Sequence, residues 1–559
     1  MWKRRRVIEM SRPPAQSSSM GRITYRRLRA PQQDGEVLID PPLAACRTDI
    51  EQNCATLEAP DARIGGRSLS ELRRLARDDL YSAALEHTNR YTSPPGIAST
   101  LSSTSRIYLV GHQPELFHPG VWLKNFVLDQ LAKRDGATAI HVLIDNDTVG
   151  DVSIRVPSGD PAEPTIERVA LDRSQATVPW EERRILDIDL FKSAGERITR
   201  ALFNFVPQPI GEQLWANLDV WDDSSTRLGT TLASMRHRLE KAWGLQTMEV
   251  PLSRLCQSEA YDWFVAFLLT RLEQVHASCN NALAEYRHLH HLRSPSHPMP
   301  DLAERDGRLE APLWIWTRED PTRRPLYVTR HETAIHLTDG NDWTNELPTT
   351  SVDDLTRVVR KLEKLARNGV KIRPRALTTT IFLRLFLGDY FIHGIGGAKY
   401  DQVTDCVIED LFGVRPPAYM TVSGTRLLPV KLPASDAETL RDINRQLRDW
   451  EFNPQRLITS DLPHETRSDL ERLAAKKQTL LQHKVASGEG KLHHGEIRLL
   501  NQRMQRLLSF RRRGLFHQRD MIEKELQIRQ VLGARDFSLC LYPESTLRPW
   551  LLGAAAEAT

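Results

Sequence analysis

The strongest constraint on the fold of this chain is the stretch from Ile107 to Asp147, where two short apolar runs flank a polar loop and a helical pattern. The first run, Ile107 to Val110, stops at Gly111, and the second covers Ala139 to Ile144. Between them, apolar residues recur at steps of three and four from Val121 to Lys133, which is the spacing of one helix face. Two strands joined through a helix pair in parallel as a right-handed crossover. The stretch therefore predicts a parallel sheet.

A second segment, Lys371 to Gly424, contains the same order of strand, loop, helix and strand. Its pattern predicts a helix from Thr378 to Leu387, a strand at Tyr390 to His393, and a last strand near Met420 to Val422, with a glycine loop and a helix between the strands. We expect one parallel sheet assembled from both segments, with the intervening residues inserted into it.

The whole chain divides into segments that differ in composition and in the period of their apolar residues. Residues 1–65 are rich in Pro, Arg, Ser and Gln and predict a loosely ordered arm, and Ser68 with Glu71 predicts the capped start of a helix. We expect the core in residues 66–165 and 371–432, a mostly helical insertion with a small strand-containing part in 166–370, and a helical coiled-coil hairpin in 433–559.

Some finer expectations follow from the same patterns. Val152 to Val156 predicts an edge strand of the core sheet, and APLWIWTRE and RPLYVTRH predict two strands within the insertion. The hairpin is predicted from Asp461 to Val485 and from Glu496 to Leu532, interrupted by SGEGKLHHG. In its second half Leu508, Leu515 and Ile522 recur every seven residues.

Composition excludes several classes of protein. Of 559 residues, 40% are hydrophobic and 26% charged, as in ordinary folded proteins. The six cysteines form no CxxC pair, which argues against a zinc ribbon or a disulfide framework and favours a reducing compartment. No apolar run is long enough to cross a membrane, so we expect a cytoplasmic protein without a membrane partner.

Charge is uneven along the chain. The net charge is +4, but residues 471–530 hold 14 Lys or Arg against 6 Asp or Glu. This segment has few aromatic residues on which bases could stack, which argues against nucleic-acid binding and favours a solvated helical face. A homodimer through the coiled coil is the partner that we expect for it.

Polar residues gather at the carboxyl ends of the first two strands, where parallel sheets bind ligands. His112 and His118 could contact a ligand or act as general acid and base, because histidine titrates near neutral pH; a structural role in the loop is the alternative. Asp145 and Asp147 could together hold Mg²⁺ or an ammonium group, or orient a base, although strand ends also carry Asp to form turns.

The glycine loop is the second candidate site. Gly394, Gly396 and Gly397 precede a helix and can admit a phosphate close to the backbone, with Lys399 supplying a positive charge in the first turn. Arg373 adds to this basic character. The loop matches neither the Walker pattern nor GxGxxG, because Lys399 stands where the third glycine belongs. A tight turn from strand to helix is the alternative explanation.

Taken together, these loops resemble the family of the cysteine-adding enzyme of bacillithiol synthesis. GHQPELFHPGVWLKN is similar to that family's TGQQxGLxxGPxYxxxK, LIDNDTVGDV to its strand ending in EDHDxxE, and RPRALTTTIFLRLFLGDYFIHGIGGAKYD to its RPLxQDxLLPxxxYVGGPxExxY. His112 replaces a glutamine of the family, and Lys399 stands near its acidic position after the glycines. The matching residues are Gly111, Gln113, Gly120, Lys124, Asp147, Arg373, Pro374, Gly396 and Gly397.

The resemblance implies an α/β fold with a split Rossmann-like core, helical insertions and a C-terminal coiled coil. It also implies a ligase that forms a C–N bond by adding cysteine to an amino sugar conjugate, with a site for ATP or ADP and for Mg²⁺. The expected nucleotide-binding residues are Gly111, Gln113, Gly120, Arg373, Gly394, Gly396, Gly397 and Lys399. The expected catalytic residues, around a small-molecule substrate, are His112, His118, Lys124, Asp145 and Asp147.

A rival hypothesis is a protein without catalytic activity. Its core would bind a metabolite, and the basic hairpin would bind a partner through Arg511 to Arg513.

Overall fold

The computed structural model describes residues 23, 25–26, 28–58, 62–90, 105–216, 218, 226–349, 354–483 and 490–557. The chain forms two compact units. The first comprises Met1–Val156, Glu167–Pro429 and Arg535–Thr559, and the second comprises Pro157–Ile166 and Val430–Ala534. Among the described residues, no helix combines the length and the hydropathy needed to cross a membrane.

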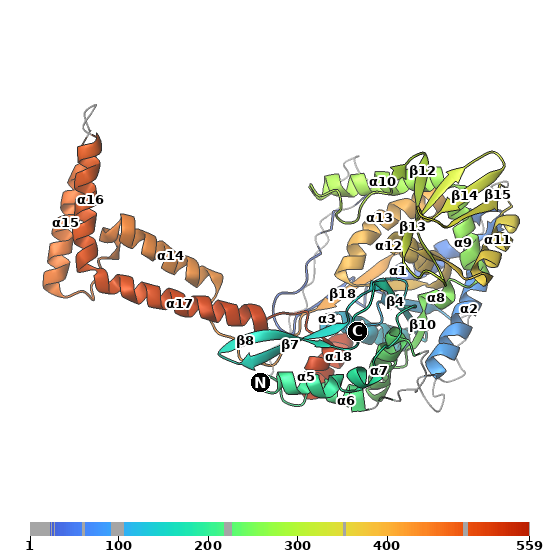
Figure 1. Cartoon of the computed structure of the whole chain (residues 1–559), viewed down its shortest axis with the longest axis horizontal. Helices are drawn as coiled ribbons and strands as arrows, with labels where there is room; N and C mark the ends of the chain where they lie inside the picture. The colour runs from blue at the N-terminus through green and yellow to red at the C-terminus, as the bar shows by residue number, and fades with distance from the viewer. Residues whose placement is uncertain are drawn as a thin grey trace. The chain divides into compact units, whose positions relative to one another are not determined.

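A six-stranded mixed sheet lies in the first unit (Figure 1). Its order is β1 (Val37–Asp40), β18 (Tyr419–Gly424), β17 (Tyr390–His393), β4 (Ile107–His112), β5 (Thr138–Leu143) and β10 (Met248–Pro251). The last five strands pair in parallel, whereas β1 pairs antiparallel to β18. All six residues of β5 are buried, as expected for a strand covered on both faces. The mixed α/β class is confirmed, and the sheet takes strands from both predicted segments.

Two strands of this sheet were not expected. β1 and α1 (Cys46–Leu57) lie within the arm that we predicted to be loosely ordered, so that prediction is wrong for this part. The physical reason is that the short apolar run of β1 completes the edge of the sheet beside β18. β10 comes from the insertion and pairs with β5. Most of the rest of the predicted arm, residues 1–22, lies outside the described residues.

The helices that follow the central strands have clear start and stop signals. α3 (Pro119–Asp135) begins after β4 with a proline in its first turn, and Gly136 ends it in the left-handed conformation at φ 62°. α13 (Ile395–Phe412) begins after β17 and ends at Gly413 in the same way. The predicted cap of α2 (Leu69–Asn89) is confirmed, since the Ser68 side chain accepts a hydrogen bond from the Glu71 N–H.

A second sheet of the same unit is wholly antiparallel. It contains β11 (Glu304–Arg305), β12 (Arg308–Thr317), β13 (Arg324–Arg330), β14 (Ala334–Thr338), β15 (Thr344–Pro348) and β16 (Val370–Pro374), with β16 paired to β12. We predicted two of these strands and assigned residues from 371 onward to the core. That assignment is wrong for Lys371–Pro374, because β16 joins the antiparallel sheet.

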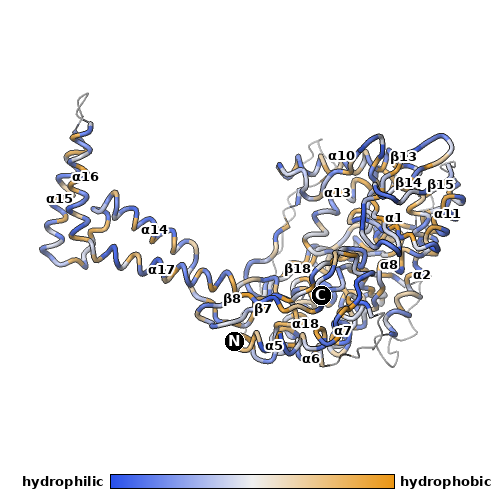
Figure 2. The backbone as a smooth tube through the Cα atoms, viewed as in Figure 1, coloured by the Kyte–Doolittle hydropathy of each residue, from blue (hydrophilic) through white to orange (hydrophobic). Residues whose placement is uncertain are grey.

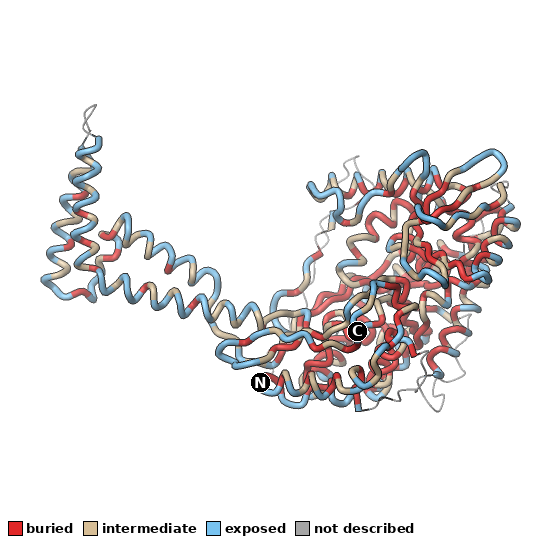
Figure 3. Tube along the Cα trace, viewed as in Figure 1, coloured by how far each residue is buried: buried red, intermediate tan, exposed pale blue. Residues whose placement is uncertain are grey.

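The other elements of the first unit fill the space around the two sheets, where Figure 3 shows most buried residues. The predicted edge strand at Val152 to Val156 is wrong, because β7 (Ser153–Asp160) pairs with β8 (Glu163–Ala170) in a separate two-stranded ribbon. The other elements that lie wholly in the first unit are β2 (Arg63–Ile64), β3 (Arg67–Ser68), β6 (Thr148–Val149), β9 (Val178–Pro179), α4 (Ile188–Lys192), α5 (Ala194–Leu202), α6 (Ile210–Ala216), α7 (Leu228–Ala242), α8 (Leu252–Leu255), α9 (Glu259–Thr270), α10 (Leu272–Leu289), α11 (Thr356–Arg367), α12 (Ala376–Phe382) and α18 (Glu544–Glu557). Residues 157–166 of the β7–β8 ribbon belong to the second unit.

Apart from residues 157–166 of the β7–β8 ribbon, the second unit is mainly helical. Its helices are α14 (Ala437–Phe452), α15 (His464–Gln482), α16 (Gly490–Leu507) and α17 (Ser509–Leu532). α14 packs along α17, and α15 packs along α16. The predicted second segment is divided, because α16 ends and α17 begins at either side of Leu508. Hydrophilic residues run along all four helices (Figure 2), and the start of the predicted interruption lies outside the described residues.

Candidate functional site

A cavity of about 860 Å³ lies at the carboxyl ends of β4, β5 and β17. We call it the main cavity. Residues of both predicted segments line it, so the histidine loop and the glycine loop face one space although they are far apart in the chain. The predicted site residues that line it are Gly111, His112, Gln113, His118, Gly120, Lys124, Asp147, Gly394, Gly396 and Gly397.

His118 is the N-cap of α3. Its Nδ1 accepts a hydrogen bond from the Gly120 N–H at 3.1 Å, so this nitrogen carries no proton. Burial, together with the charge of the nearby Arg535 guanidinium, lowers the pKa of His118 to about 4. The imidazole is therefore neutral at pH 7, and its remaining ring nitrogen carries the proton. His118 thus holds the first turn of α3 and presents a hydrogen-bond donor at the wall of the cavity.

His112 is also neutral at pH 7. Its ring meets Phe117 edge to face at a centroid distance of 4.9 Å, and burial followed by the charge of Lys124 holds its pKa well below the ordinary value. We expected both loop histidines to titrate near neutral pH. The pKa values of both are shifted downward because the loop withdraws them from water.

Lys124 is the most unusual cation of the main cavity. It lies on α3, only 3% of the residue is exposed, and its Nζ donates a hydrogen bond to the Gly111 carbonyl at 3.0 Å. Burial lowers the pKa of Lys124 to about 7, and the Arg236 charge adds to this effect. Near neutral pH this lysine therefore exists in both protonation states and can give or take a proton.

The glycines of the two loops serve different purposes. A Cβ on Gly120 would lie 2.0 Å from the Gly424 carbonyl oxygen, and a Cβ on Gly397 would lie 2.5 Å from Nδ1 of His393. These two glycines are therefore required for packing. A Cβ on Gly394 or Gly396 would meet no atom of the described residues within 4 Å, so their backbone is open toward the cavity that they line.

The glycine loop leads directly into α13. The first helical hydrogen bond runs from the Ala398 N–H to the Gly394 carbonyl, which leaves the N–H groups of Ile395, Gly396 and Gly397 outside the helical ladder. Lys399, which we expected to supply charge here, is half-buried and is not among the residues that line the cavity. The helix terminus, and not this lysine, provides the positive potential at the loop.

Asp147 belongs to a polar cluster that also lines this cavity. It accepts hydrogen bonds from Gln113 Nε2 at 2.9 Å and from Arg323 Nη1 at 2.9 Å. The Arg323 guanidinium lies 4.3 Å from the centre of the Trp314 ring, and that of Arg375 lies 3.8 Å from it. Sequence reasoning missed Arg323 and Trp314, because they reach the cavity only through the antiparallel sheet.

Asp145 and Arg373 do not line the main cavity. Asp145 accepts hydrogen bonds from the backbone N–H of Ser253 at 2.8 Å and from its hydroxyl. Arg373 donates two hydrogen bonds to Glu181, at 2.8 and 3.0 Å. Both residues line a second cavity of about 480 Å³. The expectation that Asp145 and Asp147 act on one ligand is therefore wrong, since the turn between them directs the two carboxylates apart.

Two ion networks surround the main cavity. Behind the glycine loop, Nε2 of His393 lies 2.6 Å from Oδ2 of Asp401, and Arg384 donates to the same oxygen at 2.7 Å. Burial raises the pKa of Asp401, but His393 and Arg384 outweigh it and hold the pKa well below the ordinary value. This network fixes the His393 ring against which Gly397 packs.

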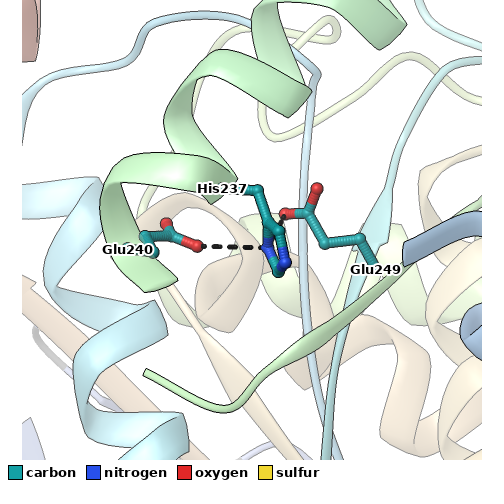
Figure 4. Close-up of side chains that lie close together, drawn as sticks. All are labelled: His237, Glu240 and Glu249. Atoms are coloured by element: carbon teal, nitrogen blue, oxygen red, sulfur yellow. Dashed lines mark ion pairs between the residues drawn. The ribbon is translucent and has the colours of Figure 1, made fainter. Parts of the chain in front are cut away.

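The second network, between α7 and β10, contains His237, Glu240 and Glu249, all buried (Figure 4). Nδ1 of His237 lies 3.8 Å from Oε2 of Glu240 and 3.9 Å from Oε1 of Glu249. The spacing is that of a metal site, but Arg236 donates to both carboxylates, at 2.8 and 2.6 Å. A guanidinium thus already supplies a positive charge, and we interpret the cluster as an internal ion network that includes Arg236, the group that helps to lower the pKa of Lys124.

The main cavity combines an open helix N-terminus, a lysine that is easily deprotonated and a carboxylate held by Gln113 and Arg323. These groups suit an anionic ligand at the helix N-terminus and a cationic or amine-bearing ligand at the carboxylate. No protein-family model matches the chain, and no curated protein is significantly similar to it in sequence.

Proposed function

We propose that this protein is a ligase-like enzyme that forms a C–N bond in the main cavity. One observation carries the proposal. Two remote segments place an open glycine loop, the buried Lys124 and the Asp147 cluster around one cavity of about 860 Å³, which is within the usual size range of small-molecule sites.

A phosphate of ATP or ADP would lie at the N-terminus of α13. Support comes from the open backbone at Gly394 and Gly396 and from the helix dipole, which together favour an anion. Arg535 lines the same cavity and donates to the Gly424 carbonyl at 3.2 Å, so the cavity also holds a cation fixed in place. Mg²⁺ would accompany the nucleotide as its counterion.

The amine substrate would approach Asp147, whose side chain is 40% exposed. In the proposed step the amine nitrogen attacks an activated carboxyl carbon, the bond to the phosphate oxygen breaks, and neutral Lys124 accepts the proton released by the nitrogen. Positioning alone can lower such a barrier by roughly 7 to 11 kcal/mol, so no strong nucleophile is needed.

The specific reaction that we propose is addition of cysteine to an amino sugar or a related amine. It rests on the resemblance of the two loops to the cysteine-adding enzymes of bacillithiol synthesis, with Gly111, Gln113, Gly120 and Lys124 at matching positions. With it we propose that the core is a split Rossmann-like domain and that α15 and α16 form a coiled-coil hairpin.

Calorimetric titration of the intact chain with ATP and ADP, with and without Mg²⁺, tests the nucleotide site. We expect binding that weakens at least tenfold in Gly396→Ala. Absence of binding under all four conditions would contradict this part of the proposal.

Incubation with ATP, cysteine and a panel of amino sugars, followed by mass spectrometry, tests the reaction. A product that gains the mass of cysteine less one water supports the ligase, and its absence from every incubation contradicts it.

A second candidate function is a binding protein without catalysis, whose basic helices contact a partner. The observation that favours it is the exposure of Leu481, Leu492 and Leu499 on α15 and α16, at 54%, 76% and 50%. The two candidates differ in a simple test. Ligand binding that survives Lys124→Met and Asp147→Ala, with a partner or a homodimer lost on neutralising Arg511 to Arg513, would favour the binding protein.

A further inference from the structure

The second cavity has the properties of a ligand site of its own. Its volume of about 480 Å³ falls within the range of small-molecule sites. It opens beyond the carboxyl ends of β5 and β10, where Leu143 and Pro251 contribute to its wall. Ligands of parallel sheets collect at this edge. None of the residues on which the following argument rests lines the main cavity, so the inference does not depend on the function proposed above.

The floor of this cavity is polar and held in place. Asp145 is only 8% exposed, and the Ser253 N–H and hydroxyl both donate to its carboxyl group. Beside it, Glu181 accepts two hydrogen bonds from Arg373 and one from Lys371 at 3.1 Å. A buried polar floor with fixed side chains presents donors and acceptors in one geometry, which is how small polar ligands are oriented.

The charges that line the cavity are not balanced. Five cationic side chains and three acidic ones line it among the described residues. Arg373 and Lys371 are paired at the floor, whereas Arg227 lies 4.0 Å from its carboxylate neighbour Glu182 with 42% of its side chain exposed. Arg254 is exposed on α8 at the same cavity. These two guanidinium groups near the opening leave an excess of positive charge that an anion would neutralise.

Uncharged polar groups complete the lining. Thr230 and Gln257 contribute a hydroxyl and an amide, and Trp180 contributes an apolar face. Burial, with the charge of Glu181, raises the pKa of Asp145 to about 7, so near neutral pH its carboxyl group can either donate or accept a hydrogen bond. A lining that both donates and accepts hydrogen bonds suits the hydroxyl groups of a ligand, which can also do both.

We propose that the second cavity binds a small polyhydroxylated anion, with its phosphate or carboxylate at Arg227 and Arg254 and its hydroxyl groups at Asp145 and Ser253. A sugar phosphate and a sugar acid share this chemistry. The site is separate from the main cavity, because Asp145 and Asp147 direct their carboxylates into different cavities.

Calorimetric titration of the full chain with glucose 6-phosphate, gluconate, glucose and inorganic phosphate tests this site. We expect one equivalent of glucose 6-phosphate or of gluconate to bind, and glucose and inorganic phosphate each to bind at least tenfold more weakly. Binding of neither organic anion would overturn the proposal. Equal binding of glucose would overturn the anionic part, and equal binding of inorganic phosphate would overturn the polyhydroxylated part.

Variants locate the binding. Arg227→Gln and Arg254→Gln should each weaken binding of the anion about tenfold, while Arg200→Gln, at an exposed arginine of α5 outside the cavity, should leave it unchanged. Asp147→Asn, in the main cavity, should also leave it unchanged. Full affinity in both the Arg227 and the Arg254 variants would overturn the assignment, because the anion would then bind elsewhere.

Discussion

Asp145 and Asp147 are separated by one residue, but their carboxylates face different cavities. Asp145 accepts hydrogen bonds from Ser253 and lines the second cavity, whereas Asp147 accepts them from Gln113 and Arg323 and lines the main cavity. The turn that carries them is thus a partition between two candidate sites. Each aspartate can be replaced to test one site while the other serves as the control.

Asp145→Asn should change how stability depends on pH. The folded-state pKa of Asp145 is raised from 3.8 to about 7 by burial and by Glu181, so its contribution to stability is complete below pH 4 and is lost as the pH rises through 7. Asparagine resembles the neutral carboxyl group and does not titrate. We expect the free energy of unfolding of the parent chain to fall by roughly 3 kcal/mol relative to the variant between pH 5 and pH 8. Urea unfolding at several pH values measures this difference. If the free energy of unfolding of the parent and of the variant changed equally with pH, the prediction would be contradicted.

Lys124→Met should stabilise the chain at neutral pH and impair the proposed chemistry. The pKa of Lys124 falls from 10.5 to about 7 on folding, so the unfolded chain binds more protons between these values and the stability of the parent rises with pH across that window. Methionine removes this penalty. We expect the variant's advantage in the free energy of unfolding to shrink by about 2 kcal/mol from pH 7 to pH 9. Lys192→Met, at an exposed lysine of α4, is the control and should show no such trend.

Gly396→Ala and Gly397→Ala form a matched pair on neighbouring residues of α13. Within the part of the chain that the structure describes, an alanine Cβ at Gly396 meets no atom closer than 4 Å, so the variant should fold at least as stably as the parent while its Cβ obstructs an anion at the helix terminus. Alanine at Gly397 would lie 2.5 Å from the His393 ring and should cost about 1 to 3 kcal/mol of stability. Thermal unfolding and titration with ADP separate the two effects. Equal stability of the two variants would contradict the assigned roles.

Arg323 and Asp147 should be energetically coupled. Their ion pair is 2.9 Å long with side chains 17% and 40% exposed, so solvent screens it and we expect a coupling of about 0.5 to 1 kcal/mol in stability. A double-mutant cycle with Arg323→Gln and Asp147→Asn measures this value. Replacement of Arg323 alone should also weaken binding of an amine substrate, since Asp147 loses the group that orients it. Additive effects of the two single changes would show that the pair is not coupled.

The sequence predicted the fold best where the signal is local. The apolar runs at β4, β5, β17 and β18 and the Ser68 cap of α2 follow from period and from capping chemistry. The strands β1 and β10 were not predicted, because a four-residue strand gains its stability from neighbours that are remote in the chain.

Only some residues of the candidate site were predicted from the sequence, for a related reason. Residue type and position at strand ends pointed to His118, Asp147 and the open glycines, and the family resemblance pointed to Lys124. The structure gathers all of them at one cavity. The direction of Asp145 depends on the turn after β5, and Arg323 reaches Asp147 only through an antiparallel sheet of another part of the chain. No local pattern encodes such relations.

The position of β4 between β17 and β5 has a consequence for synthesis on the ribosome. Until residues 390–393 have emerged, β4 has a partner on one side only, and an apolar strand edge is left without hydrogen bonds. Such an edge invites pairing with other chains. A nascent protein that stops before β17 should therefore need a chaperone to stay free of aggregates, and a truncated chain should lose its solubility together with its binding sites.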